Sequence, residues 1–332
     1  MMRTGLSMKP TGWFQVGWSG DVPAGGVVPL RYFGEDLVAF RGLDGTLHIL
    51  DAYCQHLGAN LARGGCVVDG GIQCPFHGWV WNGQGRNVHI PYQERTNTAR
   101  RIRAWYTAER NECIYLWHDA DGGEPAWEVP DALASFGQHV AARTFHPAYP
   151  QGRSHFTDLH VHPQVVAENA VDPHHFRFVH RTPESPVVLE ETADDSTWTA
   201  RVGFGRRWAD GVARPETMNT LIILWSGIGV SFNAEHTRDG MRVVSVCTTP
   251  VDDERTEIFA TYWIDHSEAD ADPGRYERRL AEAQSALPDD INIWHHQKYL
   301  EPPGLATSEA AGFRKLRRWA ASFYPASQAV AR

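Results

Sequence analysis

The chain has 332 residues, with 31 Lys and Arg against 40 Asp and Glu, a formal net charge of −9. A hydrophobic fraction of 42% with 13 Trp is enough to build a core, which excludes a disordered chain, and the acidic balance argues against nucleic acid as the main partner. No apolar signal segment opens the sequence, and the most apolar stretch, residues 221–232, is shorter than the roughly 20 residues of a membrane-spanning helix. Five cysteines, an odd count, argue against a disulfide framework. We therefore expect a globular cytoplasmic protein with no membrane span.

Residues 12–117 are predicted to be all-β. Segments rich in β-branched and aromatic residues alternate there with turn sequences such as GDVPAGG and LDG; the segments are WFQVGW, VVPLRYF, DLVAFRG and TLHILD. From residue 118 the composition shifts to HDADGGEPAWEVPD, which is typical of a connection between domains. We expect a first domain over residues 1–120, a linker over 121–150 and a second domain over 151–332.

The second domain is predicted to be α+β, with helices packed on an antiparallel sheet. Strands are expected at residues 197–204, 220–232, 241–248 and 257–264. Helices are expected at residues 163–180, 273–286 and 288–299. A C-terminal helix is expected to present one apolar face, made of Phe313, Leu316, Ala320 and Phe323.

The first group of ligand-type residues is Cys54, His56, Cys74 and His77, arranged as C-x-H, seventeen intervening residues and then C-x2-H. Two loops that each offer a thiolate and an imidazole can close around a metal centre. Zinc accepts two cysteines and two histidines, but its usual pattern pairs Cys with Cys and His with His. The alternation favours a [2Fe–2S] cluster, with one iron held by both thiolates and the other by both imidazoles.

The second group lies in ENAVDPHHFRFVH, residues 168–180. On a helix, Asp172 and His175 would be neighbours, whereas His180 would lie about 140° further round than His175, so the helix should end near it. Two imidazoles and one distant carboxylate make the facial triad of a non-haem Fe(II) site, which leaves positions open for O2. Asp289 and Asp290 are the carboxylate candidates, because they follow Pro288 on the first turn of an expected helix.

CQHLG and CPFHG resemble the two cluster-binding boxes of Rieske proteins, and residues 168–180 resemble the N-x2-D-x2-H-x4-H motif of Rieske non-haem iron oxygenases. The resemblance is closest to the oxygenase component of 3-ketosteroid 9α-hydroxylase and extends over essentially the whole chain, including RYFGEDLVAFRG, DINIW and FRKLRRWAASFY. The motif's spacing selects His175 over His174. The D-x3-W spacing of steroid-hydroxylating members selects Asp290, with Trp294, over Asp289.

The resemblance implies an N-terminal all-β Rieske domain followed by a helix-grip-like catalytic domain. It implies one [2Fe–2S] cluster and one mononuclear Fe(II) per subunit, with O2 as co-substrate. The cluster ligands would be Cys54, His56, Cys74 and His77, and the iron ligands His175, His180 and Asp290. The motif residues Asn169 and Asp172 would serve catalysis, with Asp172 accepting hydrogen bonds from His77 and His175 across a subunit boundary.

The implied reaction is hydroxylation of a steroid-like apolar substrate by a head-to-tail homotrimer. Electrons would come from NADH through a separate flavin and iron–sulfur reductase, because this sequence has no G-x-G-x-x-G signature of its own. Desaturation or oxidative demethylation is the alternative within the family, since the ligands do not distinguish these outcomes. A non-catalytic electron carrier or zinc-stapled module is the alternative of another class.

An apolar substrate pocket is expected from aromatic residues of the second domain, although core packing explains them equally well. The residues are Trp208, Trp225, Phe232 and Trp294. The cysteines outside the two boxes, Cys66, Cys113 and Cys247, are expected to be ordinary buried residues.

Overall fold

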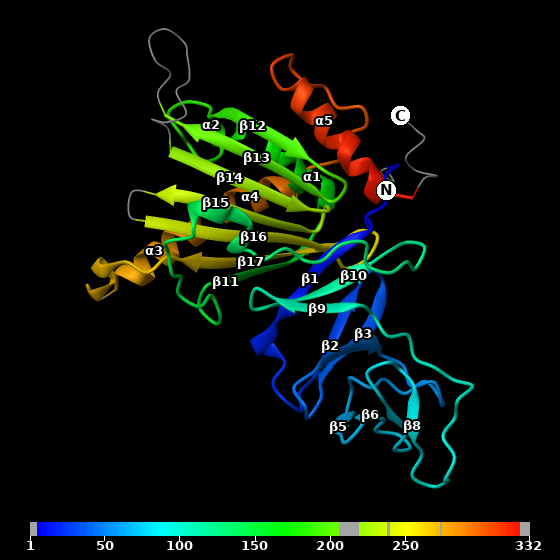
Figure 1. Cartoon of the computed structure of the whole chain (residues 1–332). Coiled ribbons are helices and arrows are strands. Elements are labelled where there is room, and N and C mark those ends of the chain that lie inside the picture. Colours follow the sequence, from blue (N-terminus) through cyan, green and yellow to red (C-terminus); the bar gives the residue numbers. More distant parts are fainter. Residues whose placement is uncertain (1–4, 206–218, 238–239, 273, 326–332) are drawn as a thin grey trace. The chain divides into compact units, whose positions relative to one another are not determined.

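The computed structural model describes residues 5–205, 219–237, 240–272 and 274–325. The chain divides into two compact units: the first contains Gln15–Trp117 and Glu124–Ala126, and the second contains the remaining residues. Figure 1 shows the course of the chain through both. Among the described residues no helix is long and apolar enough to cross a bilayer.

The first unit is all-β, as the sequence predicts, and its strands form three small antiparallel sheets. One sheet has the order β1 (Gly12–Trp18), β10 (Cys113–His118) and β9 (Thr107–Arg110), and another has the order β2 (Val27–Tyr32), β3 (Glu35–Arg41) and β4 (Leu47–Asp51). The third has the order β5 (Cys66–Val68), β6 (Gly71–Gln73), β7 (Val80–Trp81) and β8 (Asn87–His89). An apolar cluster that includes Cys54, Cys74, Trp79 and Trp81 forms a core of this unit.

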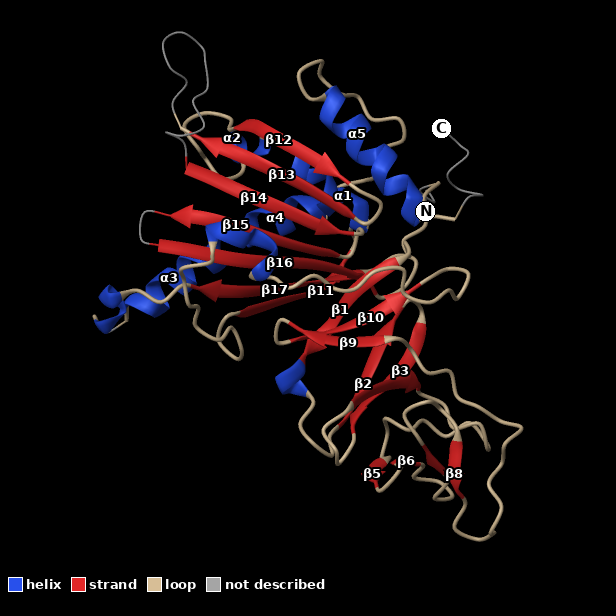
Figure 2. Ribbon diagram, viewed as in Figure 1, coloured by secondary structure: helices blue, strands red, loops and turns tan. Residues whose placement is uncertain are grey.

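The second unit is built on a seven-stranded antiparallel sheet with the order β11-β17-β16-β15-β14-β13-β12 (Figure 2). The strands are β11 (Arg153–Leu159), β12 (Val187–Ala193), β13 (Thr197–Phe204), β14 (Asn219–Ser226), β15 (Val230–Thr237), β16 (Gly240–Pro250) and β17 (Thr256–Ile264). Consecutive strands from β12 to β17 are neighbours, so this part of the sheet is a meander, and β11 pairs with β17 at its edge.

Helices pack on one face of this sheet, as the sequence predicts. They are α1 (Pro163–Glu168), α2 (His175–Phe178), α3 (Arg275–Ser285), α4 (Leu287–Trp294) and α5 (Ala310–Ala320). Short 3-10 helices lie at Ser19–Asp21, Ala134–His139, Asn169–Val171, Glu268–Ala271 and Ala321–Phe323. The core between the two layers joins sheet residues such as Trp198, Trp225 and Tyr262 to Leu287 and Ile291 of α4.

The single helix predicted over residues 163–180 is wrong. The segment forms α1, a 3-10 turn at Asn169–Val171 and α2, with a break at Asp172, whose ψ is 87°. Pro173 explains the break, because it lacks an N–H and its ring disfavours helical backbone in the residue before it. The expectation that the helix ends before His180 is confirmed, since α2 ends at Phe178.

The single strand predicted over residues 220–232 is also wrong. The chain turns at Gly227, whose φ of +58° favours glycine, and this turn separates β14 from β15. Two strands, β11 and β12, were not predicted, and the helix predicted to reach residue 299 ends at Trp294. Of the three remaining cysteines, Cys113 and Cys247 are buried as expected, but Cys66 is exposed.

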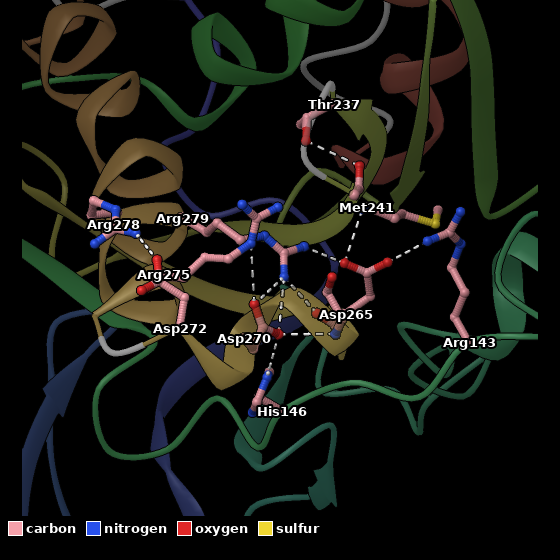
Figure 3. A network of polar contacts seen from close by, with 12 residues as sticks. Arg143, His146, Thr237, Met241, Asp265, Asp270, Asp272, Arg275, Arg278 and Arg279 are labelled. Atoms are coloured by element: carbon pink, nitrogen blue, oxygen red, sulfur yellow. Dashed lines mark hydrogen bonds and ion pairs between the residues drawn. The ribbon is translucent and has the colours of Figure 1, made fainter.

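Buried ion pairs join α3 to the sheet (Figure 3). Arg279, 8% exposed, donates to the Asp265 backbone carbonyl at 2.8 Å and pairs with the carboxylates of Asp265 and Asp270. Asp265 follows β17 directly; it also pairs with Arg143 and accepts a hydrogen bond from the Met241 N–H at 3.0 Å. Because α4 follows α3 almost without a break, this network also fixes where α4 begins.

We expect Arg279→Met to destabilise the second unit by about 3–5 kcal/mol, because it removes the buried cation that bridges the carboxylates of Asp265 and Asp270. Arg278→Met on the same helix is the matched control, since Arg278 and its partner Asp272 are both 64% exposed and such a pair contributes at most about 1 kcal/mol. Denaturant unfolding followed by tryptophan fluorescence measures both. Equal effects of the two substitutions would contradict a structural role for the buried network.

His162 fixes the start of α1. Its Nδ1 accepts a hydrogen bond from the Gln164 N–H at 3.1 Å, and its Nε2 lies 2.9 Å from the Ser7 carbonyl oxygen. The ring is 5% exposed, and burial lowers the pKa of His162 to about 4. The neutral ring therefore caps the helix and ties down the N-terminal segment.

This pKa predicts acid sensitivity. Between pH 6.5 and 4 the unfolded chain binds a proton at His162 that the native chain does not, so stability falls as the pH falls, by up to about 3 kcal/mol. His162→Asn keeps a capping acceptor but does not titrate. Urea unfolding at pH 7 and pH 4.5 should therefore show a smaller acid-induced loss in the variant than in the parent; equal losses would exclude His162 as the cause.

Candidate metal centres

Two loops in the first unit close with the same backbone hydrogen bonds. In each, the N–H of a cysteine, Cys54 or Cys74, donates to the carbonyl five residues later, and the N–H of the glycine four residues later donates back to the cysteine carbonyl, at 2.8–3.0 Å. The two glycines, Gly58 and Gly78, have φ of +79° and +71°, a conformation that favours glycine. The two boxes recognised in the sequence therefore form two similar turns.

The side chains of these loops suit a metal–sulfur centre. Cys54 and Cys74 are almost fully buried as free thiols, and burial raises the pKa of Cys54. The rings of His56 and His77 have their centroids 4.7 Å apart. The buried Nδ1 atom of His77 has no hydrogen-bond partner among the described residues, which is rare for a buried polar atom. Two thiols and an unpartnered imidazole nitrogen fit a [2Fe–2S] cluster, whose iron would take the place of the thiol protons.

Trp81 supports this group from the core of the unit. Its indole Nε1–H donates to the sulfur of Cys54 at 3.3 Å. Trp79 stacks on His56, with centroids 4.5 Å apart and planes 4° apart. The two tryptophans thus hold one cysteine and one histidine in place.

His175, His180 and Asp290 come together in the second unit. One ligand atom from each lies within 4.8 Å of the others, and this is the one such group of His, Cys, Asp and Glu in the described part of the chain. The His180 Nε2 and the Asp290 Oδ2 are 3.2 Å apart. Asp290 is 8% exposed, whereas Asp289 is exposed, so it is Asp290 that points into the group. Two imidazoles and a carboxylate at this spacing fit one divalent iron ion.

Asp172 orients His175 through the backbone break. Its carboxylate Oδ1 accepts hydrogen bonds from the N–H groups of His174 and His175 at 3.0 and 3.3 Å, which starts α2. Its backbone carbonyl accepts from the Nδ1 of His175 at 2.5 Å, while the carboxylate Oδ2 lies 3.9 Å from that nitrogen. The Nδ1 of His175 therefore carries the proton, and Nε2 keeps its lone pair for a metal.

Asn169 lies on the metal side of His175. Its Nδ2 is 3.2 Å from the His175 Nε2, and an amide N–H can donate only to an unprotonated ring nitrogen. The motif residues Asn169, Asp172 and His175 thus form one connected group. His174 is excluded from it, because its Nδ1 bonds to the hydroxyl of Ser185 at 3.1 Å.

The two histidines differ electrostatically. The hydrogen bond to Asp290 raises the pKa of His180, whereas burial lowers the pKa of His175. In the metal-free chain a proton on His180 would occupy the position between it and Asp290. Metal binding has to displace that proton, as it does for any imidazole ligand.

The aromatic residues expected in a substrate pocket separate in the structure. Trp225 and Trp294 are buried in the core between sheet and helices. Phe232 points to the opposite face of the sheet, where its ring lies 6.5 Å from that of Trp263, so it is not part of the ligand group. Trp208 lies outside the described residues.

The polar residues of β15, which runs through the middle of the sheet, are not among the site residues predicted from the sequence. Ser231, Asn233 and Glu235 alternate with apolar residues in SFNAEHT, a signal of a two-faced strand. A single strand over residues 220–232 hides this signal, because it runs through the two glycines of SGIGV, where the chain turns between β14 and β15.

We expect Asp290→Ala to lose the mononuclear iron, whereas Asp289→Ala should retain it, because only Asp290 lies with the two histidines. Metal analysis of anaerobically prepared protein should show a loss of about one iron per chain for Asp290→Ala alone. Inorganic sulfide should stay unchanged in both variants. Loss of iron in both, or in neither, would contradict the assignment of this ligand.

Two family models match consecutive parts of the chain. A family model described as the Rieske [2Fe–2S] domain matches residues 12–102, and one described as the 3-ketosteroid 9α-hydroxylase C-terminal domain matches residues 116–324. The oxygenase component of 3-ketosteroid-9-alpha-monooxygenase from Rhodococcus rhodochrous is 31% identical over 331 residues, covering 94% of this chain and 83% of the relative. Cholesterol 7-desaturase from Xenopus laevis is 29% identical over 340 residues, covering 95% and 72%.

Solved structures agree on the fold. Dicamba monooxygenase bound to 3,6-dichlorosalicylic acid superposes with a TM-score of 0.69 at 19% identity, covering 97% of this chain and 98% of the other. An all-β unit and a helix-covered sheet thus occur together in a known architecture, and the family models cover nearly all of the chain. The chain belongs to the Rieske non-haem iron oxygenases, in the family of the 3-ketosteroid 9α-hydroxylase oxygenase component.

Proposed function

We propose that this protein hydroxylates a steroid-like, mostly apolar molecule with O2. The observation that carries the proposal is the group of His175, His180 and Asp290, in a chain that also has both Rieske loops. The steroid class is supported by two relatives, one named for a 3-ketosteroid and the other for cholesterol. A non-catalytic electron carrier would have no use for the second ligand group.

The roles of the chain's own residues follow from the contacts around the two centres. When bound, the [2Fe–2S] cluster would supply single electrons and the Fe(II) ion would activate dioxygen for C–H oxidation. Asp172 holds the Nδ1 proton of His175 and so keeps the other ring nitrogen free to ligate. In the metal-free chain Asn169 donates to that nitrogen, and this hydrogen bond has to break when the ion binds, because the nitrogen has a single lone pair. Trp294, one turn along α4 from Asp290, is buried in the core between sheet and helices.

The proposed partners follow from the family. Electrons would come from NADH through a separate flavin and iron–sulfur reductase. We propose a head-to-tail homotrimer in which His77 of one subunit faces Asp172 of the next. A reducing cytoplasm suits this protein, because all five cysteines are free and two of them would have to ligate iron.

Desaturation is the second candidate reaction, because a cholesterol 7-desaturase matches nearly the whole chain. Both reactions begin with removal of hydrogen from carbon, and the ligands at the site are compatible with either. They differ in the product: hydroxylation adds one oxygen atom to the substrate, whereas desaturation removes two hydrogen atoms.

The deciding experiment uses the purified, iron-loaded protein with a generic flavin–iron–sulfur reductase, NADH, O2 and a panel of ketosteroids and sterols. Mass spectrometry of the products should show one added oxygen in at least one steroid, and a substrate lacking two hydrogens would favour desaturation. If a correctly loaded protein changes no steroid but oxidises small aromatic acids, the steroid proposal is wrong.

Asp172→Asn should retain both metal centres yet lose most steroid turnover. The amide keeps an oxygen that can cap α2, but it removes the negative charge that a donor histidine from another subunit would need. Iron and sulfide content, cluster reduction by dithionite and product formation should be measured together. Normal turnover in this variant would exclude the proposed connection between His77 and Asp172.

Trp81→Phe should lower the reduction potential of the cluster. The indole N–H that donates to the sulfur of Cys54 favours the more negative, reduced state, and losing a hydrogen bond of about 1 kcal/mol corresponds to roughly 40 mV for one electron. Redox titration followed by EPR measures the shift. Trp105→Phe is the control, because its indole donates instead to the Asp51 carboxylate; a similar shift there would contradict the assignment.

A further inference from the structure

The middle strand of the seven-stranded sheet has an unusual distribution of polar residues. In β15, Phe232 and Ala234 are buried on one face, while Ser231, Asn233 and Glu235 alternate with them on the other. We call these three residues the polar stripe. A central strand is normally apolar on the face that packs against helices. Polar side chains on that face are therefore unusual and indicate a function.

The cross-strand register places the polar stripe on the helix-covered face. Asn233 pairs with Ile223 of β14 and with Val244 of β16, and Val244 pairs with Tyr262 of β17. Directly paired residues of antiparallel strands project to the same side of a sheet. Ile223 and Tyr262 lie in the core with side chains of α4, the helix that carries Asp290. Asn233 therefore faces the layer that holds the iron ligands.

One end of the stripe carries a carboxylate, that of Glu235. Its negative charge is neutralised, because Glu235 Oε2 accepts from the Nε and Nη2 atoms of Arg242 at 2.7 and 2.6 Å. The ion pair closes this end of the stripe and leaves Asn233 as its neutral, central member.

The sheet around Asn233 is only partly covered. Val244 and Val246 lie on the same face of β16 and keep partial exposure in the middle of the sheet, as does Leu221 on β14. This surface combines three partly exposed apolar side chains with the polar side chain of Asn233. Such a surface suits an apolar ligand that carries a single polar group. The described helices thus leave this part of the sheet open.

The hydrogen bonds of Asn233 define what it can recognise. Its Nδ2 donates to the Ser231 Oγ at 3.4 Å and to the Val244 carbonyl at 3.3 Å, so both amide protons are used. The carbonyl partner also fixes the orientation of the amide, because a flipped amide would set two oxygens against each other. The Oδ1 atom accepts no hydrogen bond from the described residues and remains an acceptor. An acceptor binds a hydroxyl group, which can donate, but not a ketone.

We infer that Asn233 is a specificity-determining residue that accepts a hydrogen bond from a hydroxyl group of the substrate, so that the enzyme favours a steroid alcohol over the corresponding ketone. This inference rests on the proposed function and narrows its substrate class. Leu221, Val244 and Val246 would contact the apolar rings beside that hydroxyl.

The test measures the binding of three saturated androstanes by calorimetry to the iron-loaded protein. One carries ketones at carbons 3 and 17, and the other two each replace one ketone by a hydroxyl. The wild type should bind one of the alcohols about fivefold more tightly than the diketone, the effect of one hydrogen bond of about 1 kcal/mol. Asn233→Leu, which has a similar shape and no acceptor, should reduce this preference to less than about twofold.

Ser231→Ala is the matched control. It removes one partner of the Asn233 amide but leaves the Val244 carbonyl and the Oδ1 acceptor, so the preference for the alcohol should persist. The inference is overturned if the wild type binds the diketone as tightly as both alcohols, or if Asn233→Leu keeps the preference. Both results leave the proposed function standing. Absence of binding and turnover with every steroid would instead overturn the proposed function itself, and the inference with it.

Discussion

The proposed iron site depends on the break in the chain at Asp172 and Pro173. An unbroken helix would place His175 and His180 on different sides of its axis, so they could not bind one ion. Proline interrupts the helix, and the Asp172 carboxylate starts the next one by accepting from the following N–H groups. The same residue then fixes the ring of His175 through its backbone carbonyl. Asp172 therefore has a structural role within its own subunit, apart from any contact with a neighbour.

The third ligand depends on a different kind of interaction. Asp290 lies near the start of α4, and α4 continues from α3, which buried ion pairs hold to the end of β17. A charged network is a costly way to attach a helix, because its members must be desolvated. It is, however, directional: Arg279 bonds both to a backbone carbonyl and to two carboxylates, which fixes the helix along its length as well as against the sheet. Apolar packing alone would allow α3 to slide along the sheet.

The sequence predicts those features of this protein that depend on residues close together in the chain. The two cluster loops are recognisable because a cysteine, a histidine and a glycine must occur at short, fixed distances. Asp290 could be selected over Asp289 only through family resemblance, since both occupy the first turn of one helix and only tertiary packing buries one of them. The polar stripe could not be placed before the turn at Gly227 was known, because its meaning depends on the face to which β15 presents it. The side of the sheet on which Phe232 lies was unpredictable for the same reason.

The order of the ligands along the chain has a consequence for assembly of the enzyme. His175 and His180 precede β12, and Asp290 follows β17, so six strands of the sheet are synthesised between the histidines and the aspartate. During synthesis, His175 and His180 leave the ribosome well before Asp290 does. Two histidines alone bind a metal ion weakly and with little selectivity. Correct metallation is therefore expected to be a post-translational event that waits for the sheet to close, and iron retention would report that folding is complete.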